Sequence, residues 1–213
     1  MTESTISAAS SLLWILSAGI LGFGVAAVFA GILRLRRNLY LVFYVIAAGA
    51  LCLFFFEANG IDVGEVLSHN WVWGLVGAVV VTIPLVGNVR SQPHSPRRTG
   101  GPFFLDLFWP GLVYGLVDAL LLSVLPILAV LGAFSGAPWA AGWAGQIALG
   151  LLALLASVGV TAAYHLGYPE FRGPPVVGAI LGNGIMSLAY VITMNPLAAV
   201  LPHMTMHVVA LVH

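Results

Sequence analysis

Long apolar runs recur along this chain, and they are the feature that most limits how it can fold. A run of about 18 residues or more, wound into an α-helix, can cross a hydrocarbon core of roughly 30 Å. Backbone N–H and C=O groups in lipid must be satisfied within the protein, so such runs fold as helices. We therefore expect an all-α fold, a polytopic transmembrane helix bundle.

About seven spans are predicted, and together they form a single transmembrane domain over residues 1–213. Their ranges are 11–33, 39–57, 71–89, 105–132, 139–165, 174–194 and 197–213. Proline and glycine cluster at the breaks between them, as turn chemistry predicts. The N-terminal stretch lacks the basic segment of a secretory signal, so we expect the first span to be retained.

The composition supports lipid as the main solvent of the chain. Hydrophobic residues make up 61% and charged residues 7%, whereas soluble chains carry about 25% charged residues. The net charge is zero, so no overall field attracts nucleic acid. With one cysteine, no intrachain disulfide can form.

Charged residues predict the orientation of the bundle. All the arginines fall in or beside alternate loops, and the chain has no lysine; they are Arg34, Arg36, Arg37, Arg90, Arg97, Arg98 and Arg172. The opposite loops carry Glu57, Asp62 and Glu65. By the positive-inside rule the N-terminus is outside and the C-terminus is inside.

Aromatic and small residues fit the same arrangement. Aromatic residues at span ends predict two interfacial belts, an outer one at Trp71, Trp73, Trp139 and Trp143 and an inner one at Tyr40, Trp109, Tyr164 and Tyr168. Small residues at a spacing of four predict close helix contacts, and they are Ala18, Gly22, Ala26 and Ala30 in the first span and Gly178 and Gly182 in the sixth. Helix-mediated association between copies is compatible with this pattern.

Polar side chains at membrane depth are the candidate functional residues. An ionisable group inside a span costs roughly 2.5–3.5 kcal/mol, and it usually faces the bundle interior or a cavity. Asp118 lies about 20 Å along the fourth span, and His203 and His207 lie about 9 and 15 Å from the outer end of the seventh. Asn183 and Tyr190 of the sixth span fall at comparable depth. We expect these five residues to form one buried polar site.

The two histidines of the last span stand four residues apart, so both imidazoles lie on one helical face. This is the spacing with which two imidazoles on a helix bind one metal ion. A metal such as zinc would then be held by His203, His207 and Asp118. The alternative is that each imidazole only hydrogen-bonds a neighbouring helix.

Other polar residues are secondary candidates. Haem would need axial ligands from two helices, and His165 with His207 or His213 could supply them. Glu170 and Arg172 flank Phe171 in the stiff loop "YPEFRGPP". Arg172 suits a lipid phosphate, and Glu170 suits an arginine partner.

Two short motifs resemble the CAAX-protease and bacteriocin-processing family of intramembrane proteases. "PEFRG" at 169–173 is similar to the end of that family's first motif, and "HMTMH" at 203–207 is similar to its third. The resemblance implies that Glu170 and His203 take part in water activation or metal binding. The paired glutamate of the family is missing, and Tyr190 is followed four residues later by Met194 instead of histidine. The "GYPEFRG…GN…H…H" ending also resembles a group of bacterial polytopic membrane proteins, which implies a bacterial cytoplasmic membrane.

Three classes of function remain open from the sequence. The first and favoured class is a transporter of a small solute, or a proton-linked one, because imidazole changes charge near neutral pH and can relay protons. The second is an intramembrane hydrolase, which would be an enzyme using the histidine pair. The third is a non-catalytic membrane subunit or assembly factor.

Overall fold

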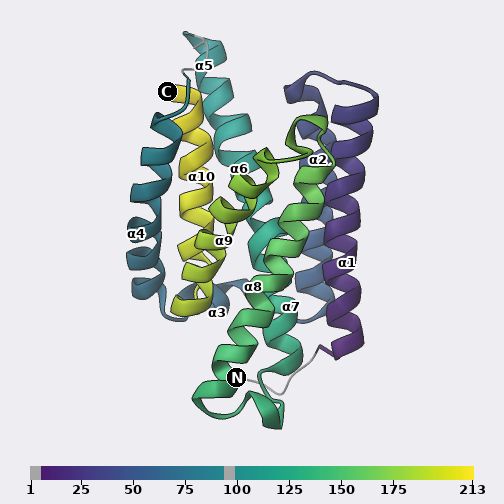
Figure 1. Cartoon of the computed structure of the whole chain (residues 1–213), viewed down its shortest axis with the longest axis vertical. Helices are drawn as coiled ribbons and strands as arrows, with labels where there is room; N and C mark the ends of the chain where they lie inside the picture. The colour runs from purple at the N-terminus through teal and green to yellow at the C-terminus, as the bar shows by residue number, and fades with distance from the viewer. Residues whose placement is uncertain (1–5, 94–98) are drawn as a thin grey trace.

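The computed structural model of the chain describes residues 6–93 and 99–213 as a bundle of long helices (Figure 1). Within these residues, six helical segments are long and apolar enough to cross a membrane. The predicted all-α polytopic bundle is therefore confirmed, and its apolar helices indicate contact with a lipid bilayer.

The first part of the bundle contains three long helices and one short one. Helix α1 (Ala8–Val25) runs on into the π-helical segment η1 (Ala26–Ile32), and α2 (Arg37–Ala58) returns beside them. The short helix α3 (Val63–Ser68) then leads to α4 (Trp71–Arg90).

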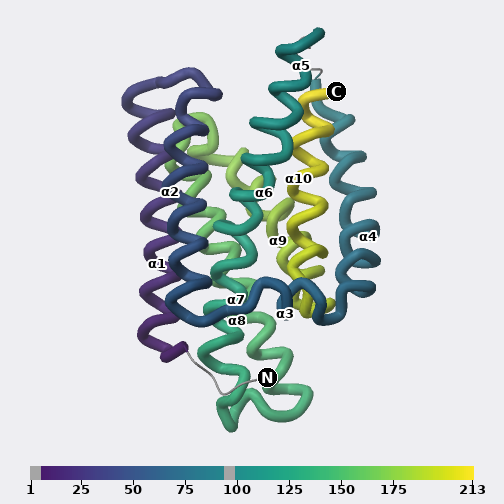
Figure 2. The backbone as a smooth tube through the Cα atoms, turned by 180° about the vertical axis from the view of Figure 1, so that it is seen from behind, coloured from purple at the N-terminus to yellow at the C-terminus, as the bar shows by residue number. Residues whose placement is uncertain are grey.

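The central element is a helix of 34 residues with two π-helical interruptions. Its segments are α5 (Gly101–Asp106), η2 (Leu107–Val113), α6 (Tyr114–Ala119), η3 (Leu120–Val124) and α7 (Leu125–Phe134). Of its most apolar 18-residue window, 67% is buried inside the protein, against 17–33% for the other five spans. In both opposite views α6 lies between α2 and α10 (Figures 1 and 2).

The last part of the chain completes the bundle. It contains the short turn η4 (Pro138–Ala140), α8 (Gly142–Leu166), the turn η5 (Pro169–Phe171), α9 (Pro175–Thr193) and α10 (Leu197–Val212). The seventh predicted span is α10, an apolar helix of 16 residues that is shorter than the other six. It packs against α4, α6 and α9, so much of its surface contacts protein.

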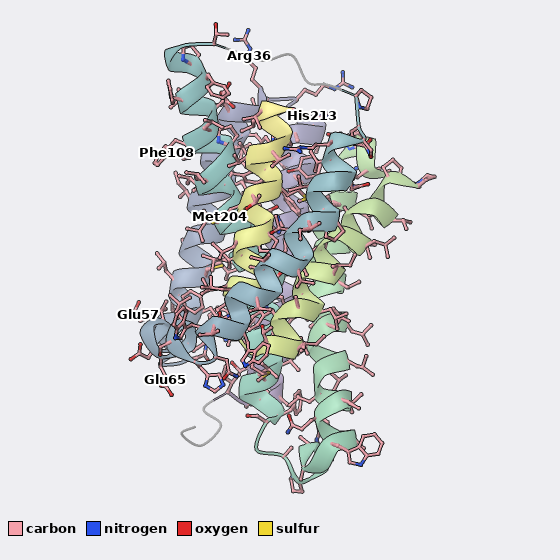
Figure 3. The ribbon with its side chains drawn as sticks, turned by 90° about the vertical axis from the view of Figure 1, so that its left-hand side faces the viewer. Arg36, Glu57, Glu65, Phe108, Met204 and His213 are labelled. Atoms are coloured by element: carbon pink, nitrogen blue, oxygen red, sulfur yellow. The ribbon has the colours of Figure 1, made fainter. Side chains whose placement is uncertain are left out.

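Charged residues are separated between the two ends of the bundle. Arg36 and His213 lie near one end, and Glu57 and Glu65 lie near the other (Figure 3). We call these the arginine end and the acidic end. Helix α1 begins at the acidic end and α10 finishes at the arginine end (Figure 1), as the predicted alternation of loops requires. The assignment of the arginine end to the cytoplasm stays a prediction.

The aromatic belts are present only in part. The four tryptophans of the predicted outer belt are 47–80% exposed, as a belt requires. The tyrosines of the predicted inner belt, Tyr40, Tyr164 and Tyr168, are buried. Assigning these tyrosines to the interface was wrong, because their hydroxyls are satisfied by one another inside the bundle.

The two stripes of small residues also differ. In the first span Ala18, Gly22 and Ala26 are buried, and a Cβ on Gly22 would lie 3.3 Å from Tyr164 Cβ, so the stripe lets α1 approach α8 closely. In α9 nothing lies within 4 Å of a Cβ built on Gly178 or Gly182. The second stripe therefore makes no helix contact within the described chain.

At the acidic end, Asn195 ties the turn between α9 and α10 to the short helix α3. The Asn195 side chain is fully buried, and its Nδ2 donates to the carbonyls of Leu67 at 2.9 Å and His69 at 2.6 Å. Its Oδ1 accepts from the N–H of Leu197 at 2.9 Å, at the start of α10.

We expect Asn195→Ala to lower the free energy of unfolding by about 1–3 kcal/mol, because buried backbone groups lose their partners. Denaturant unfolding of the detergent-solubilised protein measures this loss. The matched control is Asn88→Ala on the exposed face of α4, which should change stability little. Equal losses in the two variants would contradict the assignment.

Candidate functional site

Asp118 is the clearest polar residue in the interior of the bundle. It lies on α6, between the two π-helical segments, and it is only 2% exposed. The Tyr44 hydroxyl on α2 donates to Asp118 Oδ1 at 2.5 Å. His203 Nε2 on α10 lies 3.0 Å from Asp118 Oδ2, where an imidazole N–H donates to the carboxylate. The carboxylate therefore joins three helices.

The second histidine of α10 faces the same carboxylate. His207 Nε2 is 3.6 Å from Asp118 Oδ2, which is too long for a hydrogen bond. The rings of His203 and His207 stack with centroids 5.2 Å apart, as their four-residue spacing predicts. The predicted Asp/His cluster is thus present, and we refer to Asp118, His203 and His207 as the Asp118 triad.

A glycine pair explains how α10 comes so near to Asp118. A Cβ on Gly115 would lie 3.0 Å from Met204 Cα and 3.2 Å from His207 Cδ2. A Cβ on Gly111, one turn earlier, would lie 3.2 Å from Val208 Cγ2. The two glycines therefore form a contact surface of the small-xxx-small type. The string "GLVYG" at 111–115 carries this signal in the sequence, although it was not among the predicted stripes of small residues.

Five of the six tyrosines in the chain surround the triad or continue from it: Tyr40, Tyr44, Tyr114, Tyr164 and Tyr168. The Tyr164 hydroxyl lies 2.8 Å from that of Tyr114 and 2.6 Å from that of Tyr168, and Tyr40 is hydrogen-bonded to Tyr168. The Tyr114 ring packs edge-on against the His207 ring, with the ring centroids 4.6 Å apart. We call these residues the tyrosine cluster.

The tyrosine cluster was missed because Tyr40, Tyr164 and Tyr168 were assigned to the interfacial belt, and Tyr44 and Tyr114 were not considered. Tyr40 and Tyr44 stand four residues apart, and so do Tyr164 and Tyr168. Each pair therefore lies on one face of its segment, a pattern typical of a shared interior contact.

Tyr168 lies beyond the end of α8, and burial raises the pKa of its hydroxyl well above the ordinary value. That phenol therefore stays neutral and available as a donor at physiological pH.

Asn183 belongs to a second polar cluster on η3, α8 and α9. Its Nδ2 donates to Thr161 Oγ1 at 2.6 Å and to Ser157 Oγ at 3.1 Å, and its Oδ1 accepts from Ser123 Oγ at 3.0 Å. Ser187 Oγ lies 2.7 Å from Ser157 Oγ. All five side chains are buried. We call them the hydroxyl cluster.

Two predicted members of the polar site therefore lie outside the Asp118 triad. The hydrogen bonds of the Asn183 amide stay within the hydroxyl cluster. Tyr190 is 1% exposed and packs in an apolar part of the core with Leu149 and Met186. The prediction used depth along each helix, and depth does not determine which neighbour a side chain faces.

The secondary candidates bond elsewhere. His165 Nδ1 donates to the Thr161 carbonyl at 2.9 Å, within its own helix. Arg172 Nε donates to the Leu166 carbonyl at 3.3 Å, and Glu170 is exposed on η5.

At the end of α10, His213 Nε2 donates to the Gln92 carbonyl at 3.0 Å. His165 and His213 thus each direct a ring nitrogen to a backbone carbonyl. Among residues 6–93 and 99–213, the group that could hold a metal is instead the Asp118 triad, whose three ligand atoms lie within 4.8 Å of one another.

Comparison with protein-family models, with curated proteins and with solved structures found no match for this chain. The fold and the site define a polytopic helical membrane protein with a buried cluster of one aspartate and two histidines.

The hydroxyl cluster predicts a stability effect at Ser157. Pro126 has no N–H to donate to the Leu122 carbonyl four residues earlier, and Ser157 Oγ donates to that carbonyl at 2.7 Å. We expect Ser157→Ala to lower the free energy of unfolding by about 0.6–1.7 kcal/mol, the range for hydrogen bonds between membrane helices. Denaturant unfolding in mixed micelles measures it. The control Ser91→Ala removes an exposed hydroxyl, and a loss as large there would argue against the interhelical role.

The tyrosine cluster predicts a contrast between two buried phenols. Tyr164→Phe removes a hydroxyl that bonds to Tyr114 and Tyr168, so stability should fall by about 1 kcal/mol. Tyr190 is equally buried, but no hydrogen bond of its hydroxyl is present among the described residues. Tyr190→Phe should therefore leave the unfolding midpoint nearly unchanged. The same unfolding assay compares them, and the reverse order of effects would contradict this assignment.

Proposed function

We propose that the protein is a membrane carrier for a small, positively charged solute, which the Asp118 triad binds inside the bundle. The observation that carries the proposal is the buried Asp118 carboxylate, which faces two imidazoles instead of lipid. A carboxylate at membrane depth is costly, and such groups mark substrate and ion pathways. A carboxylate with two imidazole nitrogens beside it offers ligand atoms that suit a cation.

The backbone around the triad also supports a carrier. The π-helical segments η2 and η3 flank α6 on both sides, and π-helical turns occur frequently at functional sites. Pro202 lies inside α10, directly before His203. Secondary transporters bind their solutes near the membrane midplane, where the helix backbone departs from regular geometry, and the π-helical segments and Pro202 are local irregularities beside the triad.

The proton is the smallest solute of this kind, and a proton-linked carrier would use the same three residues. Imidazoles are suited to proton relay, and the tyrosine cluster adds hydrogen-bonding hydroxyls beside the triad. Whether the protein moves protons or another cation is decided by measuring both.

We expect Asp118→Asn to reduce cation flux in proteoliposomes to the level of protein-free vesicles, because the amide removes the only negative charge of the triad. Two trapped dyes, one sensitive to pH and one to divalent ions, report the flux. The control Glu57→Gln removes an exposed carboxylate at the acidic end and should retain wild-type flux. The proposal fails if wild-type protein moves neither probe, or if Asp118→Asn moves either at the wild-type rate.

A metal-dependent intramembrane hydrolase is the second candidate, and the observation that favours it is the presence of three ligand groups in one cluster. The proposed kinship with CAAX-protease-like enzymes would add Glu170 as a further residue for water activation or metal binding. That residue is exposed on η5 and forms no ion pair with His203 or His207 in the described part of the chain. Chelator-sensitive cleavage of a membrane-embedded peptide, lost in His203→Ala, would establish this function.

A non-catalytic subunit or assembly factor is the third proposed class. It would be established if one partner co-purified in fixed ratio with the chain, and if Asp118→Asn and His203→Ala left that complex and its function intact.

A further inference from the structure

We infer that Asp118, His203 and His207 together bind one divalent transition-metal ion of the zinc class. Binding itself is argued from the geometry of the three side chains. Only the role of the ion as the transported solute rests on the carrier proposed above.

The two distances from Asp118 Oδ2 to the histidine nitrogens are close to those between donors around such an ion. A tetrahedral zinc ion holds nitrogen and oxygen donors at about 2.0–2.1 Å, which places the donors about 3.3–3.4 Å from one another. Asp118 Oδ2 lies 3.0 Å from His203 Nε2 and 3.6 Å from His207 Nε2. These two separations bracket the tetrahedral value, and the three ligand atoms lie within 4.8 Å of one another. Coordination of one ion would draw these atoms together and displace the proton that His203 Nε2 directs to the carboxylate.

The hydrogen bonding of His207 points the same way. Its Nε2 is buried, faces Asp118 Oδ2, and has no hydrogen-bond partner within the described residues. A buried polar atom without a partner costs about 1–3 kcal/mol. A cation between His207 and the carboxylate would satisfy that nitrogen, which the hydrogen bonds of the surrounding helices leave unused.

Neighbouring residues hold the three ligands in place. Tyr44 donates to Asp118 Oδ1, the carboxylate oxygen that does not face the histidines, and so fixes the direction of Oδ2. The Tyr114 ring contacts the His207 ring, and Gly115 leaves room for that imidazole against α6. Such supporting contacts orient metal ligands and commonly change metal affinity by about 10–100-fold when removed.

The chemistry of the donors selects the class of ion. Magnesium and calcium prefer oxygen donors, whereas imidazole suits zinc, copper, nickel and iron. Two imidazoles and one carboxylate therefore favour zinc-class ions. Three protein donors leave a fourth tetrahedral position open for water or another ligand, as in zinc sites that act on a ligand. A structural zinc site would use four protein ligands.

The test is titration of detergent-purified, chelator-treated protein with zinc chloride, followed by calorimetry and by metal analysis after desalting. We expect one zinc ion per chain, and the visible absorption of tetrahedral cobalt when Co²⁺ replaces zinc. Asp118→Asn and the double variant His203→Ala/His207→Ala should lose stoichiometric binding and the cobalt spectrum. Tyr44→Phe should weaken zinc binding by about 10–100-fold.

The control is His165→Ala, which removes an intramembrane imidazole that bonds to its own helix, and it should bind zinc as the wild type does. Asp118→Asn keeps the shape of the side chain, so it tests the site even if the double variant fails to fold. The inference is overturned if the wild type takes up no zinc, or if Asp118→Asn binds it with unchanged stoichiometry and affinity.

Binding and transport can fail separately. If zinc binds with the expected stoichiometry but neither dye reports flux in proteoliposomes, the metal site stands and the carrier does not. If proton flux depends on Asp118 but zinc does not bind, the carrier stands and the metal inference is wrong.

Discussion

The Asp118 carboxylate must find donors inside an apolar bundle, and the centre of the protein is arranged around that requirement. One carboxylate oxygen accepts from Tyr44 on α2, and the other faces His203 and His207 on α10. In lipid these groups have no water as an alternative partner. The position of α6 between α2 and α10 is therefore determined by polar contacts as well as by packing.

The central helix can make these contacts because its backbone is irregular. Prolines lie in η2 and at the start of α7, and π-helical turns stand on either side of Asp118. The Ser157 hydroxyl binds the Leu122 carbonyl, to which Pro126 cannot donate. Gly111 and Gly115 bring α10 close. Features that would weaken a helix in water are thus compensated by neighbouring helices, as is common in membranes.

The two buried polar clusters differ in one property that separates their roles. In the hydroxyl cluster every side chain has hydrogen-bond partners in the cluster or on nearby backbone, and that network joins η3, α8 and α9. In the Asp118 triad, His203 Nδ1 and His207 Nε2 are buried without partners among the described residues. A satisfied network stabilises helix packing, whereas the unsatisfied nitrogens leave binding capacity for a ligand.

The sequence alone determined the helical class, the helix boundaries within a few residues and the separation of charges between the two ends. Long apolar runs, proline and glycine breaks and alternate arginine loops carry that information. The sequence also placed His203 and His207 on one face of their helix, because the helical period is fixed.

The tertiary structure decided which residues at a given depth meet. The sequence predicts Asn183 and Tyr190 at a depth comparable to that of Asp118, but Tyr44 is its hydrogen-bond partner and Asn183 bonds to Thr161. Lipid and protein interior are about equally apolar. Hydropathy therefore predicts the depth of a residue, but not whether its side chain faces lipid or a particular neighbouring helix.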